Sequence, residues 1–437
     1  MKLTIVGGGG FRVPLVHAAL LADDLIDHVA LFDVDPGRLA VIDRVLSGQT
    51  AGASSRLRHT VHTDAAEALD GADFVFSALR AGGTAARVLD ERIAADHGLI
   101  GQETVGAGGI AYALRSIPAS LELARTVARV APRAWLINFT NPAGMVTEAL
   151  AAVHPRVVGI CDSPVALARR AAAALGLDPA SVEPDYVGLN HLGWLRGLRA
   201  DGVDRLPELI GDLGLLSTVE EGRLFGPRLI GDLGALPNEY LHWFYFRREG
   251  GTGGARGAFL AEQQDRFYRC CPADPDAALA AWDAVRRERE ETYGAANREA
   301  AGGFERAAAD LVSGGYEGVA LAIMRAIGRD EPATLILNLP NAGRLTELSD
   351  DAVIEAPCDV DGRGLHPRPL APLPDYARGL VATIKQVERW TIEAATTGSA
   401  RAARLALMHH PLVDSATIAA RLLDDYRAAL PQLGYLR

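Results

Sequence analysis

The sequence has few of the residues that hold small secreted domains together, and no excess of those that bind nucleic acid. Its 437 residues include only four cysteines, Cys161, Cys270, Cys271 and Cys358, too few for a disulfide framework in a chain of this length. Lysine and arginine number 44 against 55 aspartates and glutamates, which gives a net charge of −11. Because no basic excess exists to neutralise phosphates, we expect no nucleic acid partner.

Long hydrophobic runs are also missing. No apolar stretch is long enough to span a bilayer, which takes about 20 residues, and the chain opens on MKLTIVGGGG rather than on a secretory leader. We therefore expect a cytoplasmic protein without a membrane partner. Hydrophobic residues nevertheless make up 49% of the chain, which is enough for the cores of two or three domain-sized units.

Strand-like and helix-like runs alternate over roughly the first 175 residues. The predicted strands lie in the segments KLTIVGG, HVALFDVD, GADFVFSALR, AWLINFTNP and RVVGICDSP. Such alternation is typical of right-handed βαβ units, whose parallel strands are apolar throughout because helices cover both faces. We predict an α/β fold, in which a Rossmann-like doubly wound parallel sheet precedes a mixed α+β domain, as in lactate and malate dehydrogenases.

The pattern changes after about residue 185. Residues 186–202 favour a β-hairpin, 275–300 a long charged helix, 333–343 and 352–362 two strands, and the last 60 or so residues two or three helices. The segment 247–258 holds five glycines and is either a mobile loop or a plain connector. We place an NAD-binding domain at 1–170 and a domain for substrate, metal and oligomerisation at 171–437.

A glycine-rich turn, IVGGGGFRVP, follows the first predicted strand. Gly7 and Gly9 fit the first two places of the G-x-G-x-x-G pattern, but Arg12 occupies the third. Asp33 ends the second strand about 20 residues on, where an acid binds the ribose hydroxyls of NAD and repels the 2′-phosphate of NADP. The alternative is that Asp33 caps the helix beginning at Pro36.

Polar side chains also end later strands, at the edge where ligands of parallel sheets bind. Asn138 and Asn141 could hold the nicotinamide ribose or a substrate hydroxyl, or Asn-Pro could simply stop the strand. Cys161 and His191 end two apolar runs that should reach the same rim, although a buried cysteine and a lone histidine are more often ordinary core residues.

Several motifs together resemble glycoside hydrolase family 4, the NAD- and metal-dependent glycosidases, and within it the 6-phospho-β-glucosidases. The resemblance runs nearly end to end. Its segments are the glycine turn, 79–93 (LRAGGTAARVLDERI), 98–118 (GLIGQETVGAGGIAYALRSIP), 138–144 (NFTNPAG), 159–164 (GICDSP), 188–194 (GLNHLGW), 236–241 (LPNEYL), 337–343 (LNLPNAG) and 391–413.

The resemblance implies a reaction and assigns residues to it. Cys161 and His191 would bind a divalent metal, usually Mn²⁺, and Gly10 would join Gly7, Gly9, Asp33 and Asn138 in binding NAD. Oxidation at C3 of the sugar acidifies C2, a base removes the C2 proton beside the metal, and the aglycone leaves from C1 by elimination. This family is an exception to the two-carboxylate scheme of most glycosidases.

The remaining assignments concern proton transfer and substrate binding. Tyr240 matches the base at C2, and Asp162 matches the acid, with Glu103 as a competitor. Arg87, Asn141 and, less directly, Arg256 would hold a phosphorylated glycoside. The family also implies a homodimer or homotetramer.

Two departures from the family pattern leave alternatives open. Gly10 stands where the family usually has a serine. His242 and Trp243 stand where a more basic, tyrosine-rich sequence is common. The substrate could therefore be α-linked or unphosphorylated. The chain could also be an NAD-dependent 2-hydroxy-acid dehydrogenase, or an NAD sensor in which Cys161 and His191 are core residues.

Overall fold

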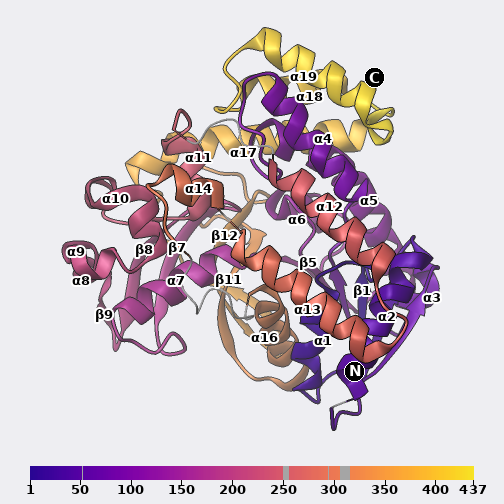
Figure 1. Ribbon diagram of the computed structural model, residues 1–437. Coiled ribbons are helices and arrows are strands. Elements are labelled where there is room, and N and C mark those ends of the chain that lie inside the picture. Colours follow the sequence, from indigo (N-terminus) through magenta and orange to yellow (C-terminus); the bar gives the residue numbers. More distant parts are fainter. Residues whose placement is uncertain (52, 250–254, 294, 306–314) are drawn as a thin grey trace.

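The protein was analysed as a computed structural model, which describes residues 1–437 except 52, 250–254, 294 and 306–314. The strands of these described residues form one 13-stranded sheet that continues through both halves of the chain. Figure 1 shows the parallel strands of the N-terminal half on one side of the molecule and the antiparallel strands of the C-terminal half on the other.

The first six strands form the parallel part of the sheet. They are β1 (Lys2–Val6), β2 (His28–Phe32), β3 (Arg58–His62), β4 (Phe74–Ser77), β5 (Trp135–Asn138) and β6 (Val157–Gly159). Their order is β3-β2-β1-β4-β5-β6, the order of doubly wound dinucleotide-binding sheets. The predicted Rossmann-like fold is therefore confirmed, and its strand order reverses between β1 and β4, the point where such sheets bind ligands.

The sequence analysis did not predict β3. This strand pairs only with β2, at the edge of the sheet, and none of its five residues is fully buried. Its sequence, RHTVH, therefore lacks the apolar run that identified the central strands.

The other strands extend the sheet in antiparallel fashion. They are β7 (Glu183–Leu189), β8 (Leu192–Ala200), β9 (Val203–Asp204), β10 (Leu236–Pro237), β11 (Ala333–Pro340), β12 (Val353–Asp361) and β13 (Gly364–Pro367). β11 joins the parallel part where Asn338 pairs with Gly159 of β6. The predicted hairpin at 186–202 and the strands at 333–343 and 352–362 are thus present.

Helices cover both faces of the parallel strands. One face carries α1 (Val13–Leu21), α2 (Pro36–Ala51) and α16 (Tyr316–Arg329), and the other carries α3 (Ala65–Leu69), α4 (Gly83–Asp96), α5 (Gly106–Val130) and α6 (Ala143–Ala151). Side chains of β1 alternate between the hydrophobic cores on the two faces of the sheet. Leu3 and Ile5 pack in the core on the first face, and Val6 packs in the core on the second.

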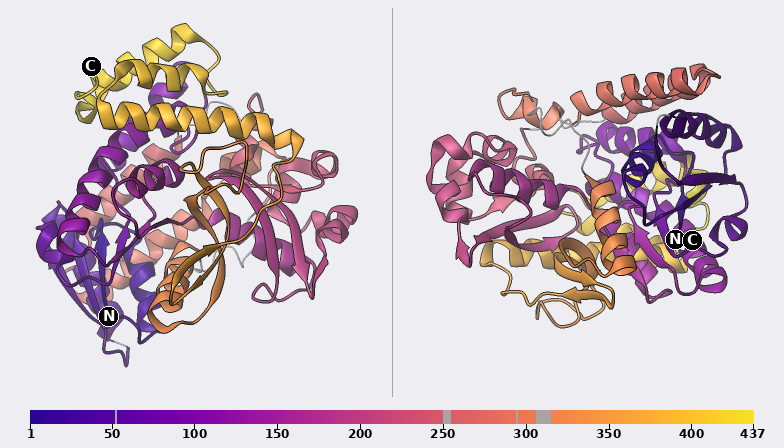
Figure 2. Two further views of the ribbon diagram at one scale, coloured as in Figure 1. Left: turned by 180° about the vertical axis from the view of Figure 1, so that it is seen from behind. Right: turned by 90° about the horizontal axis from the view of Figure 1, so that it is seen from below.

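The remaining helices belong to the C-terminal half. They are α7 (Ser163–Ala174), α8 (Leu206–Gly211), α9 (Leu213–Leu216), α10 (Glu220–Leu233), η1 (Glu239–Leu241), α11 (His242–Tyr245), α12 (Ala255–Cys270), α17 (Asp375–Thr397), α18 (Ala400–His409), α19 (Ala416–Ala429) and η2 (Pro431–Leu433). Seen from behind, α17–α19 lie together at one end of the molecule (Figure 2), where α17 packs along α5. The prediction of two or three C-terminal helices is confirmed.

Two expectations about residues 247–300 need qualification. The charged segment is not one helix, because α13 (Pro275–Glu291) ends before α14 (Ala295–Ala300) begins. The five-glycine segment lies partly outside the described residues, and α12 begins directly after them, at Ala255. Among the described helices, none combines the length and apolarity that a bilayer crossing requires.

Candidate active site

A cavity of about 1180 Å³ opens at the carboxyl ends of β1, β4, β5 and β6. Most of the side chains that the sequence analysis assigned to catalysis and binding line it. They are Gly7, Gly10, Asp33, Arg87, Asn141, Cys161, Asp162, His191, Tyr240 and Arg256, together with Glu103. Gly9 and Asn138 do not line it, so the structure brings ten of the twelve residues assigned above to one site.

In the glycine turn, the backbone of Gly7 lies close to the backbone of a neighbouring segment. Gly7 has a φ of +85°, and a Cβ there would lie 2.8 Å from the carbonyl oxygen of Ala78, so a side chain cannot be accommodated. The Gly9 amide donates to Asp33 Oδ2 at 3.0 Å, and the Gly9 carbonyl accepts from Tyr268 Oη at 2.6 Å. Gly9 is therefore used to hold the turn, which explains why it does not face the cavity.

Asp33 is not the helix cap that the sequence left open as an alternative. The cap of α2 is Asp35, whose Oδ1 accepts from the amides of Gly37 (2.9 Å) and Arg38 (3.0 Å). Asp33 accepts instead from Gly9 and from the Asp35 amide at 3.1 Å. A carboxylate has about four lone-pair positions, so Asp33 retains acceptors for ribose hydroxyls while it lines the cavity.

The two asparagines of the NFTNPAG segment have different surroundings. Asn138 is fully buried, its amide group donates to Thr140 O and Thr147 Oγ1, and its Oδ1 accepts from the Thr140 amide. Its side chain therefore holds the NFTNPAG segment together and does not line the cavity, and its assignment to NAD binding stays a prediction. Asn141 does line the cavity, and its buried Oδ1 has no hydrogen-bond partner among the described residues.

Cys161 and His191 reach the cavity from neighbouring loops after β6 and β7. Both are 5% exposed, and His191 adopts a left-handed φ of +62° at the hairpin turn. Burial lowers the pKa of His191 to about 3, so its imidazole is neutral, as a metal ligand must be. Its Nδ1 is buried without a hydrogen-bond partner among the described residues, which fits a role in holding an ion.

The surroundings of Cys161 favour its neutral thiol. Burial raises its pKa well above the usual range, and Glu355 and Asp162 raise it further. Metal binding would therefore have to displace that proton. Within the described part of the chain, no cluster of three potential ligands exists, so a cation held by Cys161 and His191 would keep places open for substrate oxygens.

Tyr240 and Asp162 lie beside this pair. The Tyr240 ring stacks on His191, with centroids 3.7 Å apart, and burial followed by Glu239 and Cys161 raises the pKa of Tyr240 well above its ordinary value. Asp162 occupies the N-cap position of α7, yet its side chain makes no capping hydrogen bond. The alternative that Asp162 serves only as a helix cap is therefore not supported.

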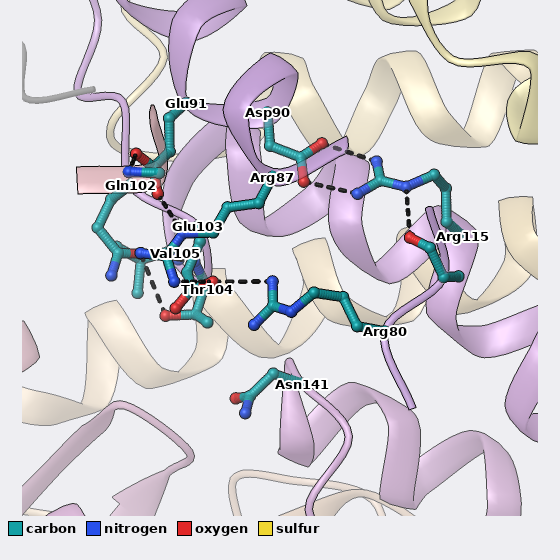
Figure 3. Close-up of polar contacts among 12 residues, drawn as sticks. Arg80, Arg87, Asp90, Glu91, Gln102, Glu103, Thr104, Val105, Arg115 and Asn141 are labelled. Atoms are coloured by element: carbon teal, nitrogen blue, oxygen red, sulfur yellow. Dashed lines mark hydrogen bonds and ion pairs between the residues drawn. The ribbon is translucent and has the colours of Figure 1, made fainter. Parts of the chain in front are cut away.

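Arg87 and Glu103 form a buried ion-pair network (Figure 3). Glu103 Oε2 lies 2.9 Å from both Arg87 Nη1 and Arg80 Nη1, and Arg87 Nε donates to Glu91 Oε1 at 2.7 Å. Burial alone would raise the pKa of Glu103, but Arg87, Arg80 and Arg289 lower it to about 2. An ionised Glu103 cannot donate a proton, which argues against it as the general acid.

The segments that carry this network are themselves held by internal contacts. Gln102 Oε1 accepts from the amides of Thr104 (2.6 Å) and Val105 (2.8 Å), which fixes the loop before α5. Asp90 of α4 and Arg115 of α5 form a two-pronged buried ion pair, with distances of 2.6 and 2.7 Å. The pair sets the position of α4 and thereby of Arg87.

Arg256 lines the cavity from the start of α12. Its guanidinium donates to the carbonyl oxygens of Thr292 (2.5 Å) and Arg289 (3.2 Å). With a further bond to Thr292 Oγ1 (3.1 Å), the end of α13 engages both terminal nitrogens of Arg256, and its assignment to substrate binding stays a prediction.

The sequence analysis missed a buried carboxylate that is hydrogen-bonded to Asn190, the residue before His191. Glu355 of β12 is fully buried and accepts from Tyr186 Oη (3.1 Å), Asn190 Nδ2 (3.1 Å) and Asn338 Nδ2 (2.9 Å). Burial raises its pKa to about 7. The one available signal was a single charged residue inside the apolar run AVIEAPC.

Comparison with known proteins agrees with this geometry. The model described as "Family 4 glycosyl hydrolase" matches residues 2–177, and that of the family's C-terminal domain matches residues 186–413. A probable 6-phospho-beta-glucosidase of Bacillus subtilis is 32% identical, over 99% of this chain and 98% of its own. The phospho-alpha-glucosidase PagL of Clostridium acetobutylicum is 30% identical, over 97% and 96%.

Solved structures show the same relationship. The 6-phospho-beta glucosidase of Thermotoga maritima, solved with manganese, NAD⁺ and glucose-6-phosphate, is 25% identical with a TM-score of 0.81, over 100% of this chain and 99% of its own. Malate dehydrogenase of Plasmodium falciparum, 12% identical with a TM-score of 0.51 over 91% of this chain and 99% of its own, shares the fold alone. The chain belongs to family 4 of the glycosyl hydrolases.

Proposed function

We propose that this protein hydrolyses the glycosidic bond of a 6-phosphoglucoside, preferably β-linked, with NAD and a divalent cation such as Mn²⁺ as cofactors. The observation that carries the proposal is the placement of Cys161, His191, Tyr240, Asp162 and Asn141 around one cavity beside the glycine turn. The relatives support a phosphorylated glucoside, but they include both alpha and beta enzymes.

Each group has a defined task in this proposal. Asp33 and the glycine turn bind the adenosine ribose and the pyrophosphate. Asn141, with its free Oδ1, accepts from a sugar hydroxyl, and Arg87 orients the sugar from a network that Glu103 holds rigid. Cys161 and His191 would hold the cation, which supplies Lewis acidity beside C2 and C3, while bound NAD supplies the reversible hydride acceptor.

Proton transfer falls to the two remaining side chains. As a phenolate, Tyr240 would accept the C2 proton, and a cation held by Cys161 and His191 would favour that phenolate by lowering the pKa of the Tyr240 hydroxyl. Asp162, which is not used as a helix cap, protonates the leaving aglycone. Glu355 keeps Asn190 in place and thereby supports the loop that carries His191.

The proposal is tested with 4-nitrophenyl β-glucoside 6-phosphate, its α-anomer and the two unphosphorylated glucosides. We expect release of 4-nitrophenol from the phosphorylated β-glucoside, dependent on metal and on catalytic amounts of NAD. Stoichiometric formation of NADH would instead indicate a dehydrogenase. Cleavage that survives removal of both NAD and metal, without an isotope effect from deuterium at C3, would refute the mechanism.

Two further assignments also remain proposals. We propose that residues 1–170 act as the NAD-binding unit and 171–437 as the unit for substrate, metal and self-association. We also predict that the protein is cytoplasmic and forms a homodimer or homotetramer. Sedimentation of the purified protein would determine its oligomeric state.

A further inference from the structure

Three side chains that line the cavity form a short chain of hydrogen bonds. They are Tyr240, Tyr293 and Glu239. The hydroxyl oxygens of Tyr240 and Tyr293 lie 3.3 Å apart, and Tyr293 Oη donates to Glu239 Oε1 at 3.0 Å. The proposed base at C2 is therefore connected to the carboxylate of its neighbour in sequence through a tyrosine 53 positions further along the chain.

The direction of these hydrogen bonds follows from the number of protons. A tyrosine hydroxyl has one proton to donate, whereas an ionised carboxylate only accepts. Because Tyr293 donates its proton to Glu239, Tyr240 is the donor in its contact with Tyr293. That contact is longer than an ordinary O–H···O bond, which is common for catalytic groups before the substrate binds. Both protons of the chain thus point from Tyr240 towards Glu239.

Neighbouring groups hold the two tyrosines in place. The Tyr240 amide donates to Asn238 Oδ1 at 3.1 Å, which fixes the start of the short helix η1. The Tyr293 carbonyl accepts from Arg298 Nη1, and the Arg256 guanidinium lies over the Tyr293 ring, 5.5 Å from its centroid. The hydroxyl groups are therefore brought together by contacts other than their own hydrogen bond.

The charged groups around Glu239 leave it close to the point of protonation at neutral pH. Burial, followed by Glu220 and Glu221 of α10, raises its pKa to about 7, against the opposite effects of Arg170 of α7 and the hydrogen bond from Tyr293. Arg170 is itself paired with Glu221, whose Oε2 accepts from Arg170 Nε at 3.1 Å. A proton acceptor is most effective when its pKa lies near the working pH.

We propose that Tyr293 and Glu239 form a proton relay that converts Tyr240 into a base. The relay rests on the proposed function and deepens it, because it specifies where the Tyr240 proton goes. Tyr240 passes its proton to the Tyr293 oxygen, while Tyr293 passes its own proton to the Glu239 carboxylate. The Tyr240 phenolate then takes the C2 proton of the sugar, and the electron pair of that C–H bond stays on the carbon.

The transfer keeps both hydrogen bonds and reverses their direction. Protonated Glu239 donates to Tyr293, and Tyr293 donates to the Tyr240 phenolate. A hydrogen bond donated to the charged form stabilises that form. In addition, one negative charge moves from Glu239 to Tyr240 and no new charge is created, so the cavity wall does not have to accommodate a further ion.

The test compares Glu239→Gln and Tyr293→Phe with the control Tyr245→Phe. Glutamine can still accept the hydrogen bond from Tyr293 but cannot take its proton, whereas phenylalanine breaks the chain. Tyr245 belongs to the same aromatic segment as Tyr240 but does not line the cavity. The substrate is 4-nitrophenyl β-glucoside 6-phosphate, or its α-anomer if the wild type prefers it, with NAD and Mn²⁺ present.

We expect both relay variants to lower kcat on the order of 100-fold, with KM little changed and a larger isotope effect from deuterium at C2. The control should stay within about twofold of the wild type. A kcat of Glu239→Gln within twofold of the wild type would overturn the relay. Loss of NAD affinity, measured by calorimetry, in proportion to kcat would also overturn it, because Tyr293 and Glu239 would then have a structural role.

The pH profile gives a readout that a structural role would not change. Because Glu239 accepts a proton only when it is ionised, kcat of the wild type should rise with pH through about 7. Glu239→Gln should lack this rise. Parallel profiles of the two proteins would overturn the relay.

Infrared spectroscopy of the ligand-free protein tests Glu239 without cofactor or substrate. The wild type minus Glu239→Gln difference isolates its carboxyl band from that of Glu355, whose pKa is also about 7. We expect this band to disappear with a midpoint near pH 7, and at a higher pH in Tyr293→Phe, since the Tyr293 hydrogen bond lowers the pKa of Glu239. A midpoint at the ordinary value for glutamate would overturn the relay. A wild type that cleaves no 4-nitrophenyl glucoside would instead defeat the proposed function.

Discussion

The ion pairs of Glu103 make a quantitative prediction about Glu103→Gln. The carboxylate lies 2.9 Å from Arg80 and from Arg87, and its pKa falls from an ordinary 4.5 to about 2 in the folded protein. At about 1.4 kcal/mol for each pKa unit, this difference corresponds to about 3 kcal/mol of stability at pH 7. Glutamine keeps the shape of the side chain but leaves both guanidinium groups without their shared counter-charge.

The sign of the pH dependence follows from the lowered pKa. A group whose pKa is depressed by folding stabilises the protein above its unfolded pKa and loses this contribution as the pH falls through the folded one. The contribution is complete above about pH 5.5 and decreases by about 2 kcal/mol between pH 7 and pH 3. Wild type and Glu103→Gln should therefore approach each other in stability as the solution is acidified.

Differential scanning calorimetry at a fixed scan rate measures this effect. With an unfolding entropy of about 2.1 cal/mol/K per residue, about 3 kcal/mol over a chain of this length lowers the melting temperature by roughly 3–4 °C. We expect that difference at pH 7 and about 1–2 °C at pH 3. Glu208→Gln, which breaks an exposed pair with Arg205, is the control. A difference that is absent at pH 7, or constant with pH, would refute the reasoning.

Three predictions concern the proposed chemistry. Cys161→Ser and His191→Ala should each abolish turnover while leaving NAD affinity, measured by calorimetry, within about twofold of the wild type; turnover retained by both at low metal concentration would contradict the metal assignment. Tyr240→Phe should slow exchange of the C2 proton for deuterium, followed by NMR, and unchanged exchange would exclude Tyr240 as the base. Asp162→Asn should lower the rate with poor alkyl leaving groups on the order of 100-fold but have little effect with 4-nitrophenol, and equal losses with both aglycones would exclude Asp162 as the acid.

Local patterns in the sequence were sufficient for the central part of the fold. Buried parallel strands are apolar along their whole length, so β1, β2, β4, β5 and β6 could be read from short runs of residues. The glycine turn and Asp33 could be placed for the same reason, since a turn after a strand and an acid about 20 residues later are local features. An exposed edge strand has no such run, and β3 was accordingly missed.

The family resemblance supplied most of the site residues, but only the tertiary structure decided how each is used. Gly9 and Asn138 have suitable positions in the sequence. In the structure, however, their polar groups are hydrogen-bonded to other residues of the protein. The structure likewise showed that Asp35, not Asp33, caps α2, and that neighbouring arginines lower the pKa of Glu103.

The sequence by itself determined the alternation of strands and helices, the glycine turn and the identity of the motifs. Only the tertiary structure decided which charges meet: Glu103 pairs with Arg80 and Arg87, and Glu355 accepts a hydrogen bond from Asn190, the residue before His191. The physical reason is that periodicity reports which side of an element is buried, whereas burial of a charge and the partner that satisfies it depend on packing between distant segments.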